Sequence, residues 1–400
     1  MSKYIDLFAG CGGLSLGLRN AGWKGIFAVE KDQFAFRTLK HNLIDKEEHF
    51  EWPDWLPISS HNIDEIILNY RNELEMLSGE VDLVAGGPPC QGFSSAGKRQ
   101  EADSRNDLIE SYLKFIEVVK PKLIFFENVK GFTAQFQANK TKGRKYSDYV
   151  INSLNRDYFV HGELVDFYDY GIPQKRCRFI LVGIRRNFAG KVGINASVFF
   201  QKMIKNKRQF LVSKKLSITP SLEEAISDLL QANGTVESIE DSKFKIGIYT
   251  EAKTNYQRFL RKGKKLTGLV ADSHRFANHT LEVRNRFETA IQKRLTGRAY
   301  REHFKLTKST INLLEAKAPA PTLTSLPDDC IHYCEPRILT VREYARIQSF
   351  PDWYEFKGKY TTGGPLRVKE VPRYSQIGNA IPPLFGEQVG NTLTELLNND

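Results

Sequence analysis

The sequence predicts an α/β fold, with a doubly wound, mostly parallel sheet and a second, smaller basic domain. Two observations predict this fold. Residues 1–186 alternate between short apolar runs and helical patterns, and continuously apolar strands between helices indicate a parallel sheet covered on both faces. A change after Arg186 predicts the second domain, because apolar runs become shorter there and basic residues accumulate.

The expected elements follow from these patterns in chain order. Apolar runs predict strands at 4–8, 25–30, 81–87, 123–128 and 178–186. Helical spacing predicts helices at 14–22, 32–42, 107–119 and 146–157, and later at 341–350 and 382–399. Asp32 is the expected N-cap of the second helix, and Pro121 ends the third. The elements between Arg186 and residue 341 have no pattern that assigns them.

The overall composition is that of a globular protein, with 41% hydrophobic and 26% charged residues. The amino terminus enters an apolar segment at once, and no uncharged apolar run approaches the ~18 residues of a membrane helix. Five cysteines are an odd and sparse set for 400 residues, which favours free thiols in a reducing compartment. We therefore expect a cytoplasmic protein with no membrane partner.

The net charge of +11 is concentrated in the middle of the chain. Residues 187–320 contain 25 Lys and Arg but only 12 Asp and Glu, and the remainder contains 33 and 35. A cationic surface of this extent suits a polyphosphate, DNA or RNA. The alternative is a lysine-rich surface that is simply well solvated.

The first predicted strand is followed by a glycine-rich turn that contains Gly10, Gly12 and Gly13. Glycines allow a tight turn and close approach to a ligand, but Ser15 occupies the third glycine position of the dinucleotide fingerprint. Glu30 ends the second strand, where a carboxylate can accept hydrogen bonds from ribose hydroxyls. The pattern favours an adenosine-type cofactor without a pyrophosphate over a nicotinamide cofactor. A glycine turn with no ligand is the alternative.

A cysteine and a carboxylate follow two other central strands. Cys90 comes after the Pro88–Pro89 pair, and Glu127 ends the next strand after four apolar residues. Adjacent strand ends lie ~5 Å apart, so the two side chains are expected to face one pocket. The polar segment 91–106 resembles a loop that closes over a bound partner. The alternative for Cys90 is an inert, buried thiol.

Two arginines at alternate positions, Arg176 and Arg178, precede the last strand of the first region. Such a pair can bind phosphate or a polar base edge, although surface ion pairs are the commoner role of arginine. The segment "CIHYC" places Cys330 and Cys334 around His332. Because no second ligand cluster is visible, we favour a strand with buried small residues over a metal site.

The chain resembles the bacterial cytosine-C5 DNA methyltransferases. The matching segments, in the order of the family, are "DLFAGCGGLSLGL", "GGPPCQGFS", "ENV", "YGIPQKRCRFILVG", "LTVREYARIQSFPD" and "YSQIGNAIPP". They cover both ends of the chain and leave only the basic middle unmatched. The resemblance implies a Rossmann-like methyltransferase fold and the restriction-modification type of enzyme.

The resemblance also implies S-adenosylmethionine as the cofactor and S-adenosylhomocysteine as the product. Where the family commonly has an aspartate that meets the adenine amine, this sequence has Asn62 before Ile63, and an amide oxygen can still accept a hydrogen bond from an amine. The implied cofactor contacts are Phe8, Ala9, Gly10, Cys11, Gly12, Gly13, Leu14, Glu30, Lys31, Asn62, Ile63, Pro89, Leu108, Asn379 and Ala380.

The implied mechanism uses Cys90 as the nucleophile that attacks C6 of cytosine and makes C5 electron-rich. Glu127 would bind N3 and the exocyclic amine, Arg178 the O2 atom, and Arg176 would support Arg178. The base must be flipped out of the duplex, and the loop 91–106 is expected to close behind it. No metal is required, and we expect a monomer.

The domain assignment follows from the same matches. Residues 1–186 and 337–400 form the expected catalytic and cofactor-binding domain, and 187–336 form the expected target-recognition domain that binds double-stranded DNA near the bacterial nucleoid. Three alternatives remain open: an RNA (tRNA) cytosine-C5 methyltransferase, a non-catalytic DNA-binding relative, and a nicotinamide oxidoreductase. The sequence does not reveal which bases are recognised.

Overall fold

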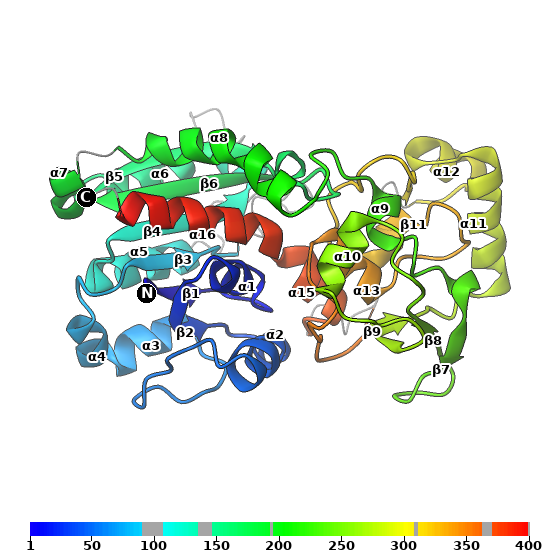
Figure 1. The fold of residues 1–400 in the computed structure, drawn as a ribbon, viewed down its shortest axis with the longest axis horizontal. Coiled ribbons are helices and arrows are strands. Elements are labelled where there is room, and N and C mark those ends of the chain that lie inside the picture. Colours follow the sequence, from blue (N-terminus) through cyan, green and yellow to red (C-terminus); the bar gives the residue numbers. More distant parts are fainter. Residues whose placement is uncertain (90–106, 135–145, 193–194, 308–310, 362–369, 399–400) are drawn as a thin grey trace. The chain divides into compact units, whose positions relative to one another are not determined.

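The computed structural model describes residues 1–89, 107–134, 146–192, 195–307, 311–361 and 370–398. The chain divides into two compact units (Figure 1). Unit 1 contains residues 1–166, 177–207 and 385–400, and unit 2 contains residues 167–176 and 208–384. Within the described residues, no helix is both long enough and apolar enough to cross a membrane.

A six-stranded sheet forms the centre of unit 1, with the order β2-β1-β3-β4-β6-β5. The first four of these strands run parallel, whereas β6 runs antiparallel to both β4 and β5. The sheet is therefore mostly parallel, as predicted. The strands are β1 (Lys3–Leu7), β2 (Lys24–Val29), β3 (Leu83–Gly86), β4 (Leu123–Val129), β5 (Tyr158–Asp166) and β6 (Cys177–Arg185).

The helices predicted at 14–22, 32–42, 107–119, 146–157 and 382–399 are present in the structure, whereas four other helices among the described residues of unit 1 were not predicted. The helix predicted at 107–119 has these bounds in the structure, and Asp32 caps its helix by accepting hydrogen bonds from the N–H groups of Phe34 and Ala35. The helices are α1 (Gly13–Asn20), α2 (Gln33–Leu39) with a π-helical turn (Lys40–Lys46), α3 (Ile63–Asn69), α4 (Arg71–Met76), α5 (Asp107–Val119), α6 (Tyr146–Leu154), α7 (Arg186–Val192), α8 (Ser197–Ser213) and α16 (Pro383–Leu397). Residues 208–213 of α8 and 383–384 of α16 belong to unit 2.

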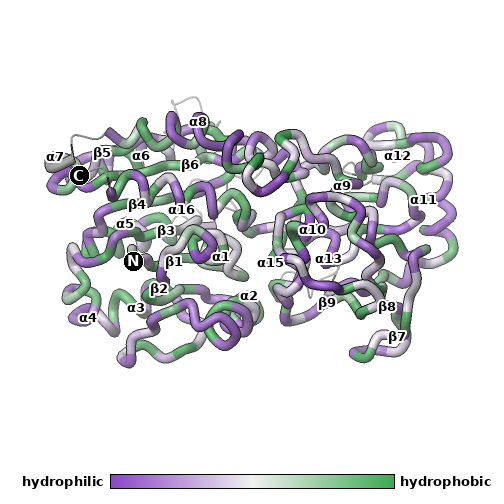
Figure 2. Tube along the Cα trace, viewed as in Figure 1, coloured by the Kyte–Doolittle hydropathy of each residue, from purple (hydrophilic) through white to green (hydrophobic). Residues whose placement is uncertain are grey.

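The core of unit 1 lies on the two faces of the sheet. The side chains of β3 and the first four residues of β4 are fully buried, because helices cover both faces of these central strands. In Figure 2, the tube through β6 is mostly hydrophobic, whereas α11 (Leu281–Lys293) in unit 2 is mostly hydrophilic. Unit 1 thus has the buried sheet that the apolar runs predict.

Helices α1 and α16 cross at glycines, although they come from opposite ends of the chain. A Cβ atom on Gly17 would lie 2.6 Å from the backbone of Gly386, so only glycine permits this approach. One turn further on, the indole N–H of Trp23 donates to the carbonyl oxygen of Gly390 at 3.0 Å. The last helix therefore holds the helix that follows the glycine-rich turn.

Unit 2 is a mixed module with a small antiparallel sheet of order β7-β8-β9 and a two-stranded parallel pair, β10-β11. The strands are β7 (Thr235–Glu237), β8 (Lys245–Ile248), β9 (Val270–Arg275), β10 (Asn312–Leu313) and β11 (Cys330–Ile331). The helices are α9 (Leu222–Ile226), α10 (Asn255–Arg261), α11, α12 (Gly297–Phe304), α13 (Val341–Ile347) and α15 (Arg373–Asn379).

Buried ion pairs fix the predicted helix α13 inside unit 2. The fully buried guanidinium of Arg346 binds Asp228 at 2.6 Å and Asp352 at 2.8 Å. Arg337 forms a two-pronged pair with Glu343 at 2.7 and 2.8 Å. Burial alone would raise the pKa of Glu343, but the adjacent Arg337 outweighs it and lowers the pKa.

The compact units and the predicted domains have different boundaries. Residues 187–207, predicted for the recognition domain, belong to unit 1, and residues 337–384, predicted for the catalytic domain, belong to unit 2. The predicted domains are defined by function, and the units by packing. The assignment by function therefore remains a prediction.

Candidate active site

The ends of β3 and β4 bring two predicted features together in unit 1. A Cβ atom on Gly87 would lie 2.8 Å from Oε2 of Glu127, so the chain after β3 passes directly against this carboxylate. The amide of Asn128 donates to the carbonyl oxygen of Pro88 at 3.2 Å. The segment that leads to Cys90 is thus held beside Glu127. Cys90 itself, like the loop 91–106, lies outside the described residues.

Glu127 and Arg178 form an ion pair across the β4–β6 strand pair. Nε of Arg178 lies 2.9 Å from Oε1 of Glu127, and the two side chains are only 12% and 13% exposed. Arg178 also donates from Nη1 to the carbonyl oxygen of Cys177 at 2.9 Å. A partly buried carboxylate beside a guanidinium, at strand ends of an α/β sheet, is suited to binding a polar ring.

Arg176 belongs to unit 2, whereas Arg178 belongs to unit 1. The side chain of Arg176 is buried, and its Nη1 donates to the carbonyl oxygen of Leu323 at 3.3 Å. Its own carbonyl oxygen accepts from the N–H of Phe167 at 3.0 Å. These contacts give Arg176 a role in the packing of unit 2, and its support of Arg178 remains a prediction.

The glycine-rich turn has the unusual backbone that its sequence predicts. Gly10 and Gly12 have φ angles of 56° and 84°, and α1 begins at Gly13. Phe8 also has a positive φ, 57°, which is strained for an aromatic residue. A Cβ atom on Gly10 would find nothing within 4 Å, so the turn has open space beside it.

Glu30 connects this turn to the start of α2. Its Oε2 accepts from the N–H of Gly10 at 2.8 Å, and its Oε1 accepts from the N–H of Asp32 at 2.7 Å. Burial raises the pKa of Glu30, although these backbone donors act in the opposite direction. Each carboxylate oxygen has a second lone pair, so the group can hold the turn and still accept a hydrogen bond from a hydroxyl.

Ser15 and Asp6 explain why the third glycine of the dinucleotide fingerprint is absent. The hydroxyl of Ser15 donates to Oδ2 of Asp6 at 2.5 Å, and both side chains are buried. Burial raises the pKa of Asp6 to about 7. Asp6 was not predicted from the sequence, although a carboxylate inside an apolar strand is the same signal that selected Glu127.

Asn62 has a structural role that the sequence analysis did not predict. It is the N-cap of α3, and its Oδ1 accepts from the N–H of Asp64 at 3.0 Å. Ser111 on α5 donates to Oδ1 of Asp64 at 2.5 Å, which ties the two helices together. The side chain of Asn62 is half-buried, and its Oδ1 has a second lone pair, so the predicted hydrogen bond from the adenine amine remains a prediction.

The other predicted cofactor residues are distributed over both units. Cys11, Leu14 and Ile63 are buried, whereas Leu108 is half-buried and Lys31 and Pro89 are exposed. Asn379 and Ala380 belong to unit 2, at the end of α15, where the amide of Gln348 donates to the carbonyl oxygen of Ala380 at 3.4 Å.

His332 in the "CIHYC" segment is engaged by the backbone. Its Nδ1 accepts from the N–H groups of Cys334 at 3.2 Å and Glu335 at 3.3 Å, and burial lowers its pKa to about 3. Cys330 is buried in β11, whereas Cys334 is exposed. Among the residues with described positions, no group of three or more His, Cys, Asp or Glu could hold a metal ion.

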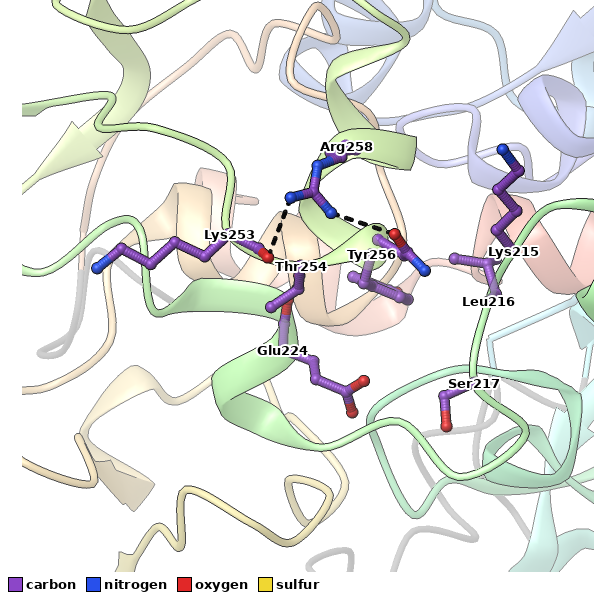
Figure 3. A pocket seen from close by; sticks show the side chains of 9 residues that line it. Lys215, Leu216, Ser217, Glu224, Lys253, Thr254, Tyr256 and Arg258 are labelled. Carbon is purple, nitrogen blue, oxygen red and sulfur yellow. Dashed lines mark hydrogen bonds between the residues drawn. The ribbon is translucent and has the colours of Figure 1, made fainter.

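A separate surface pocket lies in unit 2 and contains none of the predicted site residues (Figure 3). Its volume is about 470 Å³. Arg258 donates to Oδ1 of Asn255 and to the carbonyl oxygen of Lys253, as the dashed lines show. The lining residues are Lys215, Leu216, Ser217, Glu224, Lys253, Thr254, Asn255, Tyr256 and Arg258.

The sheet order, the glycine turn with its carboxylate and the polar strand ends define a Rossmann-like methyltransferase fold. A crystal structure described as a DNA modification methyltransferase from an Escherichia coli prophage superposes with a TM-score of 0.65 at 26% identity, over 100% of both chains. The S. pombe Dnmt2 methyltransferase, at 16% identity and a TM-score of 0.53, shares the fold over 100% of both chains.

The profile of the C-5 cytosine-specific DNA methylase family matches residues 2–395. The chain is 32% identical over 406 residues to the Type II methyltransferase M.DdeI of Desulfomicrobium norvegicum. The match covers 98% of this chain and 88% of that protein. It is also 30% identical to the Type II methyltransferase M.XorII of Xanthomonas oryzae, and the match covers 98% of this chain and 84% of that protein. The chain belongs to the C-5 cytosine-specific DNA methylase family and is a DNA cytosine-5-methyltransferase.

Proposed function

We propose that this protein transfers a methyl group from S-adenosylmethionine to C5 of a cytosine that is flipped out of a specific duplex DNA sequence. The observation that supports this most is the Glu127–Arg178 ion pair beside Gly87, three residues before Cys90. It places an anionic acceptor and a guanidinium next to the segment that carries the nucleophile. A cytosine edge offers the complementary set, an exocyclic amine, N3 and O2.

In this mechanism, the thiolate of Cys90 adds to C6, and the C5–C6 π electrons become available at C5. Glu127 binds the amine and N3 and favours protonation at N3, which prevents charge from accumulating on the ring. Arg178 donates to O2. After C5 has gained the methyl group, a base removes the C5 proton, the S–C6 bond breaks and the thiolate is released.

The residues of the glycine turn fit the proposed cofactor. The open space beside Gly10 gives room for a ligand, and Glu30 has lone pairs for ribose hydroxyls. Phe8, Leu14 and Ile63 would surround its apolar parts. When bound, the cofactor supplies an electrophilic sulfonium methyl group. Neither the turn nor the mechanism requires a metal.

The basic region 187–336 is the proposed target-recognition domain. Its cations would neutralise phosphates, and a few side chains would contact base edges. The atom C6 cannot be reached inside a stacked duplex, so the mechanism requires an extruded base. The loop 91–106 would close behind that base.

The decisive experiment is trapping on duplex DNA that contains 5-fluorocytosine. Fluorine cannot leave as the C5 proton does, so the enzyme should remain covalently attached after methyl transfer. We expect a denaturation-resistant complex that requires S-adenosylmethionine and is absent for Cys90→Ser. DNA binding without trapping would refute the mechanism and favour a non-catalytic relative. Incorporation of labelled methyl groups into transfer RNA rather than DNA would refute the proposal that DNA is the substrate.

A further inference from the structure

Arg275, the last residue of β9 in unit 2, lies between two aromatic rings. Its guanidinium carbon is 4.0 Å from the ring centroid of Phe244 and 3.8 Å from that of Tyr360. Phe244 directly precedes β8, and the backbone of Ile246 pairs with Arg275. Both rings pack against the guanidinium and restrict the rotation of the Arg275 side chain before any ligand binds.

The hydrogen-bond donors of Arg275 are not used within the part of the chain that the structure describes. No hydrogen bond or ion pair there engages its side chain. The neighbouring Arg373 is different: it lies 4.1 Å from the same Tyr360 ring and donates to Gly358, Ser273 and Glu240. Glu240, the nearby anion, is therefore held by Arg373.

A second stacked arginine shows what a purely structural role looks like. The guanidinium of Arg186 in unit 1 lies 4.2 Å from the Phe159 ring, and its Nε and Nη2 both donate to the carbonyl oxygen of Asn155 at 3.1 and 2.7 Å. Its stacking and its donors serve the same local contact. Arg275 has the stacking without the hydrogen bonds.

The backbone beside Arg275 is also distorted. The β8–β9 register shifts between Ile246 and Ile248, and Ser273 has a φ of 58° in the strand that leads to Arg275. Irregularities of this kind redirect side chains, and they persist where the surrounding structure enforces them. Ser273 is buried and accepts a hydrogen bond from Arg373 at 3.1 Å, which holds the distortion in place.

We propose that Arg275 reads a guanine in the target duplex by donating two hydrogen bonds to O6 and N7 of its major-groove edge. This inference rests on the proposed function. Guanine presents two acceptors in one plane, which a guanidinium fork matches, and this pair is the commonest specific contact of arginine with DNA. A phosphate contact requires charge but no fixed plane. The stacking of Arg275 therefore favours a base edge.

The first experiment compares the methylated sequences of wild-type protein, Arg275→Lys and Arg275→Ala by bisulfite sequencing of host DNA. Both variants should relax the preference for guanine at one position by about tenfold or more, because lysine keeps the charge but loses the planar fork. Arg186→Lys is the matched control and should leave the recognised sequence unchanged. An unchanged sequence in both Arg275 variants, with normal folding by circular dichroism, would overturn the proposal.

The second experiment replaces guanine by 7-deazaguanine, one position at a time, in a synthetic substrate duplex. At the position that Arg275 reads, kcat/KM of the wild type should fall severalfold, and the Arg275→Ala variant should show no further loss there. Independent, multiplicative losses at every position would contradict the assignment. Arg275→Ala could instead lose affinity equally for all sequences, with the salt dependence of binding reduced by the amount expected for about one phosphate contact. That result would indicate a contact with the DNA backbone and would also overturn the proposal.

These outcomes are distinguishable from failure of the proposed function. If the wild-type protein forms no adduct with 5-fluorocytosine DNA, the methylation mechanism fails. If it forms the adduct and the Arg275 variants keep the wild-type sequence preference, only the role of Arg275 fails.

Discussion

Nε of Arg178 lies 2.9 Å from Oε1 of Glu127, across two antiparallel strands of the central sheet. The relationship predicts that Glu127→Gln will lower the rate of methyl transfer by about 100-fold or more, because the amide cannot favour N3 protonation. DNA affinity should change only slightly. Single-turnover methylation and a binding titration measure the two quantities.

The control for this prediction is Glu163→Gln, a carboxylate on β5 whose partner is His161 at 3.0 Å. It should leave the single-turnover rate unchanged. If Glu127→Gln and Glu163→Gln behave alike, the carboxylate of Glu127 has no part in the chemistry.

Cys90→Ser should abolish methylation and retain DNA binding. An alcohol is far less ionised than a thiol near neutral pH, so the oxygen is a poor nucleophile toward C6. Incorporation of label from methyl-labelled cofactor measures the activity, and a gel-shift titration measures binding. Normal turnover of this variant would rule out the covalent step.

Helices and strands could be predicted from the sequence where the burial of their own faces produces a clear pattern of apolar residues. The predicted helix at 107–119 was correct at its carboxyl end, Val119, because the apolar stripe and the following Pro121 define that end. At its other end, Asp107 is the first residue of the described segment 107–134. Strand β5 was missed, because it is the edge strand of the sheet and only two of its nine residues are buried. Without two buried faces, it lacks the apolar run that revealed the central strands.

The candidate site was only partly predictable, for a related physical reason. Strand ends and their polar residues are local features, so Glu127 and the glycine turn could be located. The Arg178–Glu127 contact depends on the antiparallel pairing of β4 and β6, which no local pattern specifies. Asn62 was assigned to a ligand without its capping role, because α3 was not recognised from its sequence.

Glu30→Ala should weaken binding of S-adenosylhomocysteine by at least tenfold. The substitution removes a hydroxyl acceptor and also releases the N–H of Gly10 that Glu30 holds at 2.8 Å. Isothermal titration calorimetry measures the affinity. Asp32→Ala is the control: it removes the α2 cap and costs about 1 kcal/mol of stability, but should leave the affinity nearly unchanged. Equal affinities in Glu30→Ala and wild type would mean that the ribose binds elsewhere.

Asp6 predicts a pH dependence of stability. Its pKa in the folded protein is about 7, above the ordinary value of 3.8, so the folded state binds the proton more tightly than the unfolded chain does. The associated stability is present below about pH 4 and is lost as the pH rises through about 7. A pKa shift of this size corresponds to a change of at most about 4 kcal/mol in the free energy of unfolding.

Asp6→Asn should therefore flatten the decline of the free energy of unfolding between pH 5 and pH 8. Urea titrations at several pH values measure it. The exposed Asp54→Asn should keep the wild-type slope. A wild-type slope in Asp6→Asn would show that another group causes the dependence.

Gly17→Ala should destabilise unit 1 by about 2–3 kcal/mol, because its Cβ would lie 2.6 Å from the Gly386 backbone and force α1 and α16 apart. Once the helices have separated, Gly386→Ala should cost less than it does in the wild type. Denaturant unfolding of the single and double variants measures this coupling. Gly22→Ala, where nothing lies within 4 Å, should combine additively with Gly386→Ala.

The crossing of α1 and α16 has a consequence for the order of events during synthesis. Trp23 and the Gly390 carbonyl that it binds are 367 positions apart, so α1 cannot pack against α16 until residue 390 has left the ribosome. Long-range closures of this kind slow folding. In a nascent chain, the glycine-rich turn and α1 consequently lack this packing partner until α16 (Pro383–Leu397) has been synthesised.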